Sequence, residues 1–211
     1  MVVLRQISDI ASLQGPVHLA IGVFDGVHRG HQAVIGSAVS QAKRDAGVPV
    51  LVTFEPHPVQ VLAPDRAPQL LTSHEQKLAL VEALGVGHAL VIPFGRAFAQ
   101  LTGEAFVDLM LEHANDLRSV HVGEGWCFGH QRSGTVPMLQ ELGAEKGFAV
   151  HAVPHVAWKG ETVNSTKIRQ ALEQGALSRV AALLGRAYGI MGTVEAGQKL
   201  ARHLGFPTAN L

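Results

Sequence analysis

The chain has 211 residues, of which 47% are hydrophobic and 5% aromatic, a composition typical of an α/β domain whose sheet is buried on both faces. Its 17 acidic and 17 basic side chains balance, so there is no broad basic field for nucleic acid, and Cys127, the only cysteine, has no partner for an internal disulfide. Without a signal-peptide pattern or an apolar run of roughly 18 residues, the sequence predicts a cytoplasmic protein that does not bind membranes.

Short apolar runs alternate with segments of helical spacing along most of the chain. The predicted strands are 17–24, 48–54, 88–93, 119–123 and 148–153, and the predicted helices between them are 30–46, 73–84, 102–114 and 136–146. Thr72 or Ser73, and Thr102, are expected to cap the second and third of these helices. This alternation predicts an α/β fold with a doubly wound parallel sheet of about five strands.

Polar loops rich in glycine or proline follow four of the predicted strands. They read GVFDGVHRGH, FEPHP, PFGRAF and GEGWCFGHQRSG. Ligands of such sheets bind beyond the carboxyl ends of the strands, where the strand order reverses. We therefore expect the four loops to line one site.

The pattern changes near the C-terminal end. Residues 164–174 and 176–184 predict two short helices, and the following residues have glycines and short β-prone pieces without a helical period. This predicts two domains, residues 1–185 and an incomplete β-rich piece at 186–211.

His28 and His31 follow the first strand, with Gly30 between them. If a helix begins here, both imidazoles face the same way at its N-terminus, where free N–H groups favour an anion. Gly30 would let a flat group approach the backbone, and Asp25–Gly26 would form the tight turn before the helix. Two alternatives remain from the residues alone: a zinc site, which lacks an obvious third ligand, and a solvated helix start.

Six stretches of the chain occur in the order GVFDGVHRGH, VTFEPHP, LLTSHEQKLALVEALGV, FGHQRSG, VNSTKIRQAL and LGFPTANL. In this order they resemble the bacterial bifunctional riboflavin kinase/FMN adenylyltransferases, or FAD synthetases, of the cytidylyltransferase-like nucleotidyltransferases. The resemblance covers essentially the whole chain and implies a Rossmann-like HxGH nucleotidyltransferase fold. It implies in-line attack of the FMN phosphate on the α-phosphorus of ATP, with Mg²⁺, giving FAD and pyrophosphate.

The resemblance also implies a role for each matching residue. His28, His31 and Arg169 would act on the phosphates in catalysis. The residues that would bind nucleotide and flavin are Gly22, Phe24, Gly26, Gly30, Phe54, Pro56, His57, Pro58, Gly123, Asn164, Ser165 and Thr166.

Two of these segments also have plainer interpretations. Ser165 and Thr166 can donate to phosphate, but such residues also cap ordinary surface helices. The prolines of FEPHP would hold Phe54 and His57 beside the flavin, although Phe54 is explained equally well as a core residue. In the family the segment with Ser165 and Thr166 faces the histidines across the triphosphate, which favours the functional interpretation there.

The sequence departs from the family pattern in two places. Gly125 stands where the family usually has Asn or Asp, and the lost hydrogen bond is worth on the order of 1 kcal/mol. Trp126 beside it offers a flat surface for stacking. Thr208 and Asn210 resemble the ATP and magnesium motif of riboflavin kinase, but the chain ends at Leu211, so we expect an incomplete barrel and no kinase activity on riboflavin.

Two other functions compete with FAD synthesis. A nucleotidyltransferase could use another phosphate acceptor, although FEPHP and the PTAN stretch near the end argue against this. A flavin- or nucleotide-binding protein without turnover is the second possibility, and it is motivated by Gly125 and by the incomplete kinase part.

Overall fold

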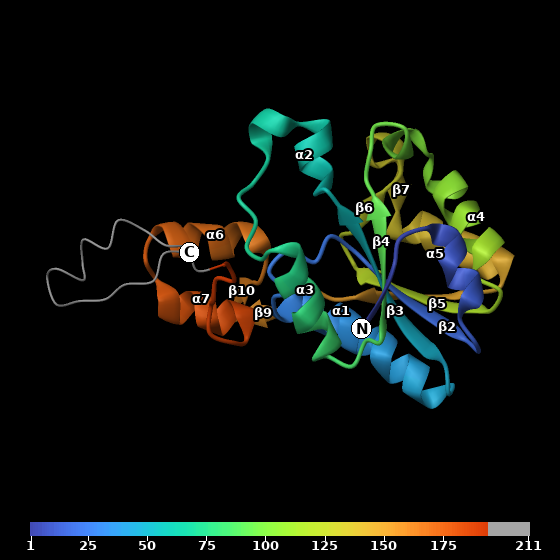
Figure 1. Cartoon of the computed structure of the whole chain (residues 1–211), viewed down its shortest axis with the longest axis horizontal. Helices are drawn as coiled ribbons and strands as arrows, with labels where there is room; N and C mark the ends of the chain where they lie inside the picture. The colour runs from blue at the N-terminus through green and yellow to red at the C-terminus, as the bar shows by residue number, and fades with distance from the viewer. Residues whose placement is uncertain (194–211) are drawn as a thin grey trace, which may run out of the picture.

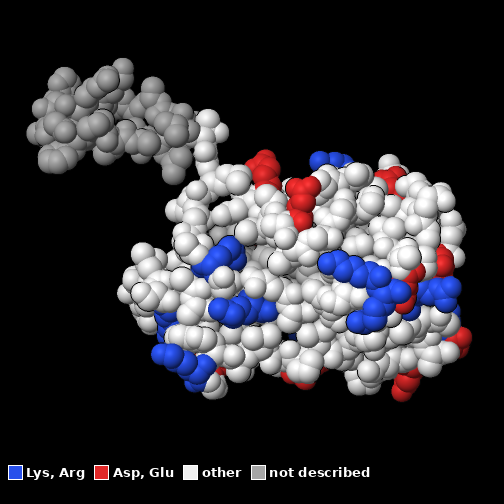
Figure 2. Space-filling model, turned by 90° about the horizontal axis from the view of Figure 1, so that it is seen from below, with Lys and Arg blue, Asp and Glu red and all other residues white. Residues whose placement is uncertain are grey.

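The computed structural model describes residues 1–193. Most of the predicted second domain, including the metal candidates Thr208 and Asn210, lies outside the described residues. No helix in the described part of the chain is long and apolar enough to cross a bilayer. Figure 2 shows Lys and Arg side chains in separate groups on one face, one of which lies against acidic side chains.

Six parallel strands form the central sheet, in the order β1-β4-β3-β2-β5-β8. The strands are β1 (Val2–Leu4), β2 (Val17–Ile21), β3 (Val48–Glu55), β4 (His88–Pro93), β5 (Leu117–Gly123) and β8 (Ala149–Val153). The five predicted strands are confirmed with small shifts of their ends. The edge strand β1 was not predicted, because three residues are too few to show a period.

Helices cover both faces of the sheet, giving three layers (Figure 1). The helices are α1 (Arg29–Arg44), α3 (His74–Glu82), α4 (Gly103–His113) and α5 (Val136–Lys146). Successive strand residues point to opposite faces, so Ala20 packs under α1 and α3 while Leu19 and Ile21 pack toward α4 and α5. The predicted caps Ser73 and Thr102 accept hydrogen bonds from the N–H groups at the starts of α3 and α4.

The strand order reverses at β2. From β2 the chain builds outward through β3 and β4 on one side and through β5 and β8 on the other. The loop that follows β2 therefore opens into the crevice between the two halves, which is where doubly wound folds bind their ligands.

Several shorter elements complete the fold. They are α2 (Pro58–Leu62), the hairpins β6 (Cys127–Phe128) with β7 (Gly134–Thr135) and β9 (Ala157–Trp158) with β10 (Glu161–Thr162), and the 3₁₀ turns Ile7–Ser12, Pro64–Arg66, Phe98–Gln100 and His130–Arg132. The two predicted C-terminal helices are present as α6 (Ser165–Glu173) and α7 (Leu177–Leu184). They bury their own apolar cluster against Leu71, beyond the N-terminal end of α1 (Figure 1).

Candidate active site

His28 and His31 stand together at the N-terminus of α1. His28 is the N-cap residue, and its Nδ1 accepts a hydrogen bond of 3.3 Å from the backbone N–H of His31. The two imidazoles stack, with ring centroids 3.5 Å apart and planes inclined by 19°. The prediction that both rings face the same way is confirmed. Because Nδ1 accepts, the proton of a neutral His28 ring lies on Nε2, which leaves that nitrogen free to donate to a ligand.

Both imidazoles are held neutral. Burial lowers the pKa of His28 to about 4, with a smaller contribution from the charge of Arg186. Burial lowers the pKa of His31 well below its usual value, and repulsion of a protonated His31 by a protonated His28 and by Lys77 adds to the shift. The Nδ1 atom of His31 is buried and has no hydrogen-bond partner among residues 1–193. At neutral pH the pair therefore offers N–H donors without a positive charge.

The loop between β2 and α1 has a constrained backbone. Phe24 and Val27 are buried and have φ values of +55° and +40°, which are rare for residues other than glycine and concentrate at functional sites. The Phe24 ring packs edge-on against His31, with centroids 5.3 Å apart. A Cβ atom at Gly22 would lie 3.1 Å from the Phe24 ring, so Gly22 leaves room for that ring.

Gly26 and Gly30 are required by close packing within the protein. Gly26 has φ of +80°, and a Cβ atom there would lie 2.7 Å from the Leu71 side chain. A Cβ atom at Gly30 would lie 3.1 Å from Cε1 of His28. The His28 ring therefore lies close to Gly30. The approach of a ligand to the backbone at Gly30 stays a prediction.

Arg186 fixes the same loop from the far end of the sequence. Its guanidinium donates to the carbonyl oxygens of Gly26, at 2.9 Å, and Val27, at 3.3 Å. Gln32 donates to the carbonyl oxygen of Leu184, and Gln76 to that of Gly189. The residues just after α7 are therefore hydrogen-bonded to the loop and to α3, although the predicted boundary placed Arg186 in the next domain.

The N-terminus of α6 lies beside that of α1. Asn164 caps α6 by accepting a hydrogen bond of 2.9 Å from the N–H of Lys167, and Thr166 is exposed at the helix start. The Ser165 hydroxyl donates to the carbonyl oxygen of Asp25 at 3.0 Å. The structure thus brings together the two segments that the resemblance paired, with two sets of free N–H groups side by side.

Asp25 is a buried centre of polar contacts that the sequence analysis treated as a turn residue. Its carboxylate accepts hydrogen bonds from the backbone N–H groups of Leu71, at 2.9 Å, and Thr72, at 3.3 Å. It also forms an ion pair with Arg169, whose Nε donates to the carbonyl oxygen of Gln69 at 2.7 Å. Arg169 is therefore anchored within the protein, and its contact with a phosphate stays a prediction.

A second part of the crevice is a cavity of about 570 Å³ with mainly apolar walls. All four predicted loops contribute to it, and its aromatic lining consists of Phe54, Phe94, Phe98, Phe106, Trp126 and Phe128. Neighbouring phenylalanine rings meet edge-on, as in Phe106 and Phe128, whose centroids are 6.0 Å apart. Trp126 stacks flat on Phe128, with centroids 4.5 Å apart and planes inclined by 10°. The cavity is therefore shaped for a flat aromatic group.

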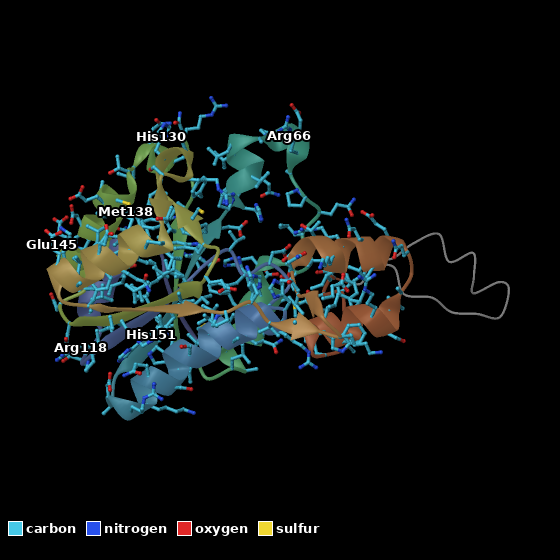
Figure 3. The ribbon with its side chains drawn as sticks, turned by 180° about the vertical axis from the view of Figure 1, so that it is seen from behind. Arg66, Arg118, His130, Met138, Glu145 and His151 are labelled. Atoms are coloured by element: carbon cyan, nitrogen blue, oxygen red, sulfur yellow. The ribbon has the colours of Figure 1, made fainter. Side chains whose placement is uncertain are left out.

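The FEPHP loop and the hairpin after β5 stand on two sides of this cavity. In Figure 3 the hairpin region carrying His130 and the 3₁₀ turn after α2 that ends at Arg66 rise above the same edge of the sheet. Phe54 is 9% exposed and belongs both to the core and to the cavity wall. Its interpretation as a core residue is confirmed, and its contact with a flavin stays a prediction. His57 and Pro58 line the wall, whereas Pro56 and Gly123 are not among its lining residues.

Among residues 1–193, no group of three or more histidine, cysteine, aspartate or glutamate side chains is arranged to hold a metal ion. The zinc alternative for His28 and His31 therefore has no third ligand in that range. The arrangement instead consists of neutral N–H donors and two helix N-termini beside an aromatic cavity.

Comparisons with known proteins agree with this arrangement. The FAD synthetase family matches residues 10–167, and the riboflavin kinase family matches residues 184–211. The chain is 39% identical over 195 residues to the "Bifunctional riboflavin kinase/FMN adenylyltransferase" of Escherichia coli (strain K12), covering 92% of this chain and 62% of that protein. It is 36% identical to the Bacillus subtilis (strain 168) protein of the same name, covering 92% of this chain and 61% of the relative.

A solved structure shares the fold. The protein described as "Macrolide-efflux Protein from Streptococcus pneumoniae" superposes with a TM-score of 0.83 at 27% identity, covering 99% of this chain and 67% of that one. The chain spans about 62% of the length of the E. coli relative, and the family match extends over most of the described residues. The chain belongs to the FAD synthetase family.

Proposed function

We propose that the chain transfers AMP from ATP to FMN, giving FAD and pyrophosphate. The observation that carries this proposal is the position of the aromatic cavity next to the paired helix N-termini. FMN combines a flat aromatic ring system with a phosphate at the end of a short chain. The cavity suits the ring system, the helix N-termini suit phosphates, and membership of the FAD synthetase family supports the same assignment.

The reaction requires the protein to position the two phosphates and to stabilise charge, and it requires no general base. An oxygen of the FMN phosphate forms a bond to the α-phosphorus of ATP, and the bond to the β,γ-pyrophosphate breaks and leaves its electron pair with pyrophosphate. The nucleophile is already an anion, so no side chain has to remove a proton. Neutral His28 and His31 and the starts of α1 and α6 would position the α-phosphate and stabilise the charge that spreads over its oxygens.

Magnesium would reach this site with ATP. Mg²⁺ prefers oxygen ligands and keeps several waters, and it is usually bound through substrate phosphates and one or two carboxylates. The described residues offer no group of three metal-binding side chains. Its ligands would therefore come mainly from the triphosphate and from water.

The proposal is tested by mixing the purified chain with FMN, ATP and Mg²⁺ and following FAD by chromatography. FAD should accumulate with stoichiometric pyrophosphate. Adenylylation of nicotinamide mononucleotide, phosphopantetheine or glycerol phosphate in place of FMN would assign the site to another acceptor. Binding of FMN and ATP without any FAD would show a binding protein that has no turnover.

Restoring a polar side chain at position 125 should improve FMN handling. Gly125 lines the cavity, and a Cβ atom there would meet only His155, at an ordinary contact distance of 3.5 Å. Gly125→Asn is therefore expected to fit and to raise kcat/KM for FMN roughly fivefold, the equivalent of one added hydrogen bond. Gly87→Asn, at a glycine with open space around it outside the cavity, is the control. An unchanged kcat/KM in Gly125→Asn would contradict the prediction.

A further inference from the structure

Lys77 is a buried amine on the core-facing side of α3. Lys77 is only 6% exposed, and it lies on the same side of α3 as the fully buried Val81 one turn later. Its Nζ donates to two neutral oxygens at long distances, 3.3 Å to the Thr53 hydroxyl and 3.4 Å to the Val23 carbonyl. No carboxylate among the described residues lies within 4.0 Å of this nitrogen. Lysines are almost never buried in this way without a partner.

The acidic groups around Lys77 are already engaged. Asp25 is paired with Arg169 and accepts two backbone N–H groups. Glu55 is partly exposed and lies 3.3 Å from His74. Burial lowers the pKa of Lys77, and the charges of Glu55 and Asp25 offset only part of this shift. The ammonium group is therefore under-compensated in the free protein.

Lys77 lies between the two halves of the candidate active site. A small pocket beside it, of about 10 Å³, is lined by Lys77, Asp25, Glu55 and Thr72 and shares Phe54 and His57 with the aromatic cavity. A phosphate that contacts Lys77 therefore has to displace side chains around this pocket. On the other side, the charge of Lys77 contributes to the lowered pKa of His31. A phosphate joined by a short chain to a ring in the cavity would lie in this region before it meets a nucleotide at the helix N-termini.

We propose that Lys77 binds the phosphate of the flavin substrate. This assignment rests on the proposed function and adds a residue to it. A phosphate would supply the anionic partner that Lys77 lacks, through a charge-assisted hydrogen bond in a site with little water. Lys77 would hold the nucleophilic oxygen in place and would bind only flavins that carry a phosphate.

The test compares FMN with riboflavin, which has the same ring system and no phosphate. Dissociation constants are measured by quenching of flavin fluorescence for the wild-type chain and for Lys77→Met. FMN binding should weaken about 10- to 100-fold in the variant, the loss expected for a hydrogen bond between charged groups, whereas riboflavin binding should change less than about twofold. Lys43→Met, at an exposed lysine in the last turn of α1, is the matched control and should bind both flavins normally.

Stability separates this role from a structural one. Replacing an under-compensated buried charge with an apolar side chain of similar length should leave the melting temperature unchanged or raise it. If Lys77 only supported the fold, its replacement would lower the melting temperature and would weaken the binding of FMN and of riboflavin equally. Lys77→Gln keeps a donor for Thr53 and Val23 and provides a second variant, which should also lose FMN affinity.

Three results would overturn the assignment: unchanged FMN affinity in Lys77→Gln, equal losses for FMN and riboflavin, or a loss of ATP affinity in place of FMN affinity. The last result would assign Lys77 to the triphosphate. A wild-type chain that binds neither flavin would instead contradict the proposed function itself, so the two failures are distinguishable.

Discussion

Replacing His28 with alanine is expected to slow FAD formation about 100- to 1,000-fold, the usual effect of losing one donor aimed at charge that develops in a transition state. The Nδ1 atom of His28 accepts the N–H of His31, so the proton of the neutral ring lies on Nε2 and faces the crevice as a donor. His31→Ala should have an effect of the same order, because the two rings are stacked and present their edges together. Initial rates at saturating FMN and ATP, followed by chromatography, provide the measurement.

A second variant separates catalysis from helix capping. His28→Ala removes the N-cap acceptor of α1 and is expected to destabilise the chain by about 1 kcal/mol. Asparagine is a good N-cap residue, so His28→Asn should keep the stability of the wild type and still lose most of the activity. His113→Ala, at the C-terminal end of α4 and outside the crevice, is the control. Wild-type rates in both His28 variants would remove the histidine pair from the mechanism.

The sheet could be predicted because its strands are buried on both faces and read as continuous apolar runs. The central strand β2 shows this most clearly, since all five of its residues are buried. The elements that were missed are short: β1 has three residues, and each strand of the two hairpins has two. Pairing across the chain defines these elements, and no local period marks them.

The site residues also divide into those that a local sequence motif marks and those that only contacts between distant segments define. His28 and Asn164 were predicted from the family resemblance, and in the structure each caps its helix by accepting the N–H of the residue three positions later. The capping candidates considered for α6 were Ser165 and Thr166, one and two residues too late in the chain. The ion pair of Asp25 with Arg169, the contact of Arg186 with the β2–α1 loop and the burial of Lys77 depend on segments far apart in the chain. No local pattern reveals them.

The amino-acid sequence contains one indication of the aromatic cavity, namely the positions of its few phenylalanines. Aromatic residues make up only 5% of the chain, and five of its eight phenylalanines line this cavity. In a chain with so few aromatic residues, Phe94 and Phe98 in the short loop after β4 mark that loop as a ligand wall. The loop PFGRAF was predicted to line the site, but Phe94 and Phe98 were not predicted as lining residues.

A second group of histidines lies in the core, away from the crevice. His18, 0% exposed, and His121, 1% exposed, are joined through the Ser119 hydroxyl by two contacts of 2.7 Å. The other ring nitrogen of His121 contacts the Ser37 hydroxyl of α1 at 2.8 Å. Burial, followed by the charges of His151 and His18, lowers the pKa of His121 to about 3. Burial also lowers the pKa of His18, although Asp45 offsets part of the shift.

These buried histidines are expected to make the protein sensitive to mild acid. The unfolded chain takes up protons on histidine as the pH falls below about 6.5, whereas the folded state resists protonation until much lower pH. The free energy of unfolding should therefore be constant above pH 6.5 and should fall progressively below it. His28 and His121 should each contribute a loss of roughly 1–2 kcal/mol between pH 8 and pH 5, given folded pKa values of about 4 and 3.

Urea unfolding at pH 8, 6.5 and 5 measures this loss, and two variants assign it. His121→Gln and His28→Asn remove one titrating ring each, so each should flatten the pH dependence by its own share, and the double variant by the sum. His121→Gln is expected to be less stable than the wild type at pH 8, because it disturbs the hydrogen bonds with Ser119 and Ser37. Its free energy of unfolding should nevertheless fall less between pH 8 and pH 5. If the urea midpoint of the wild-type chain were the same at pH 5 and pH 8, these rings would accept protons freely in the folded state. That result would also contradict the assignment of His28 and His31 as neutral donors.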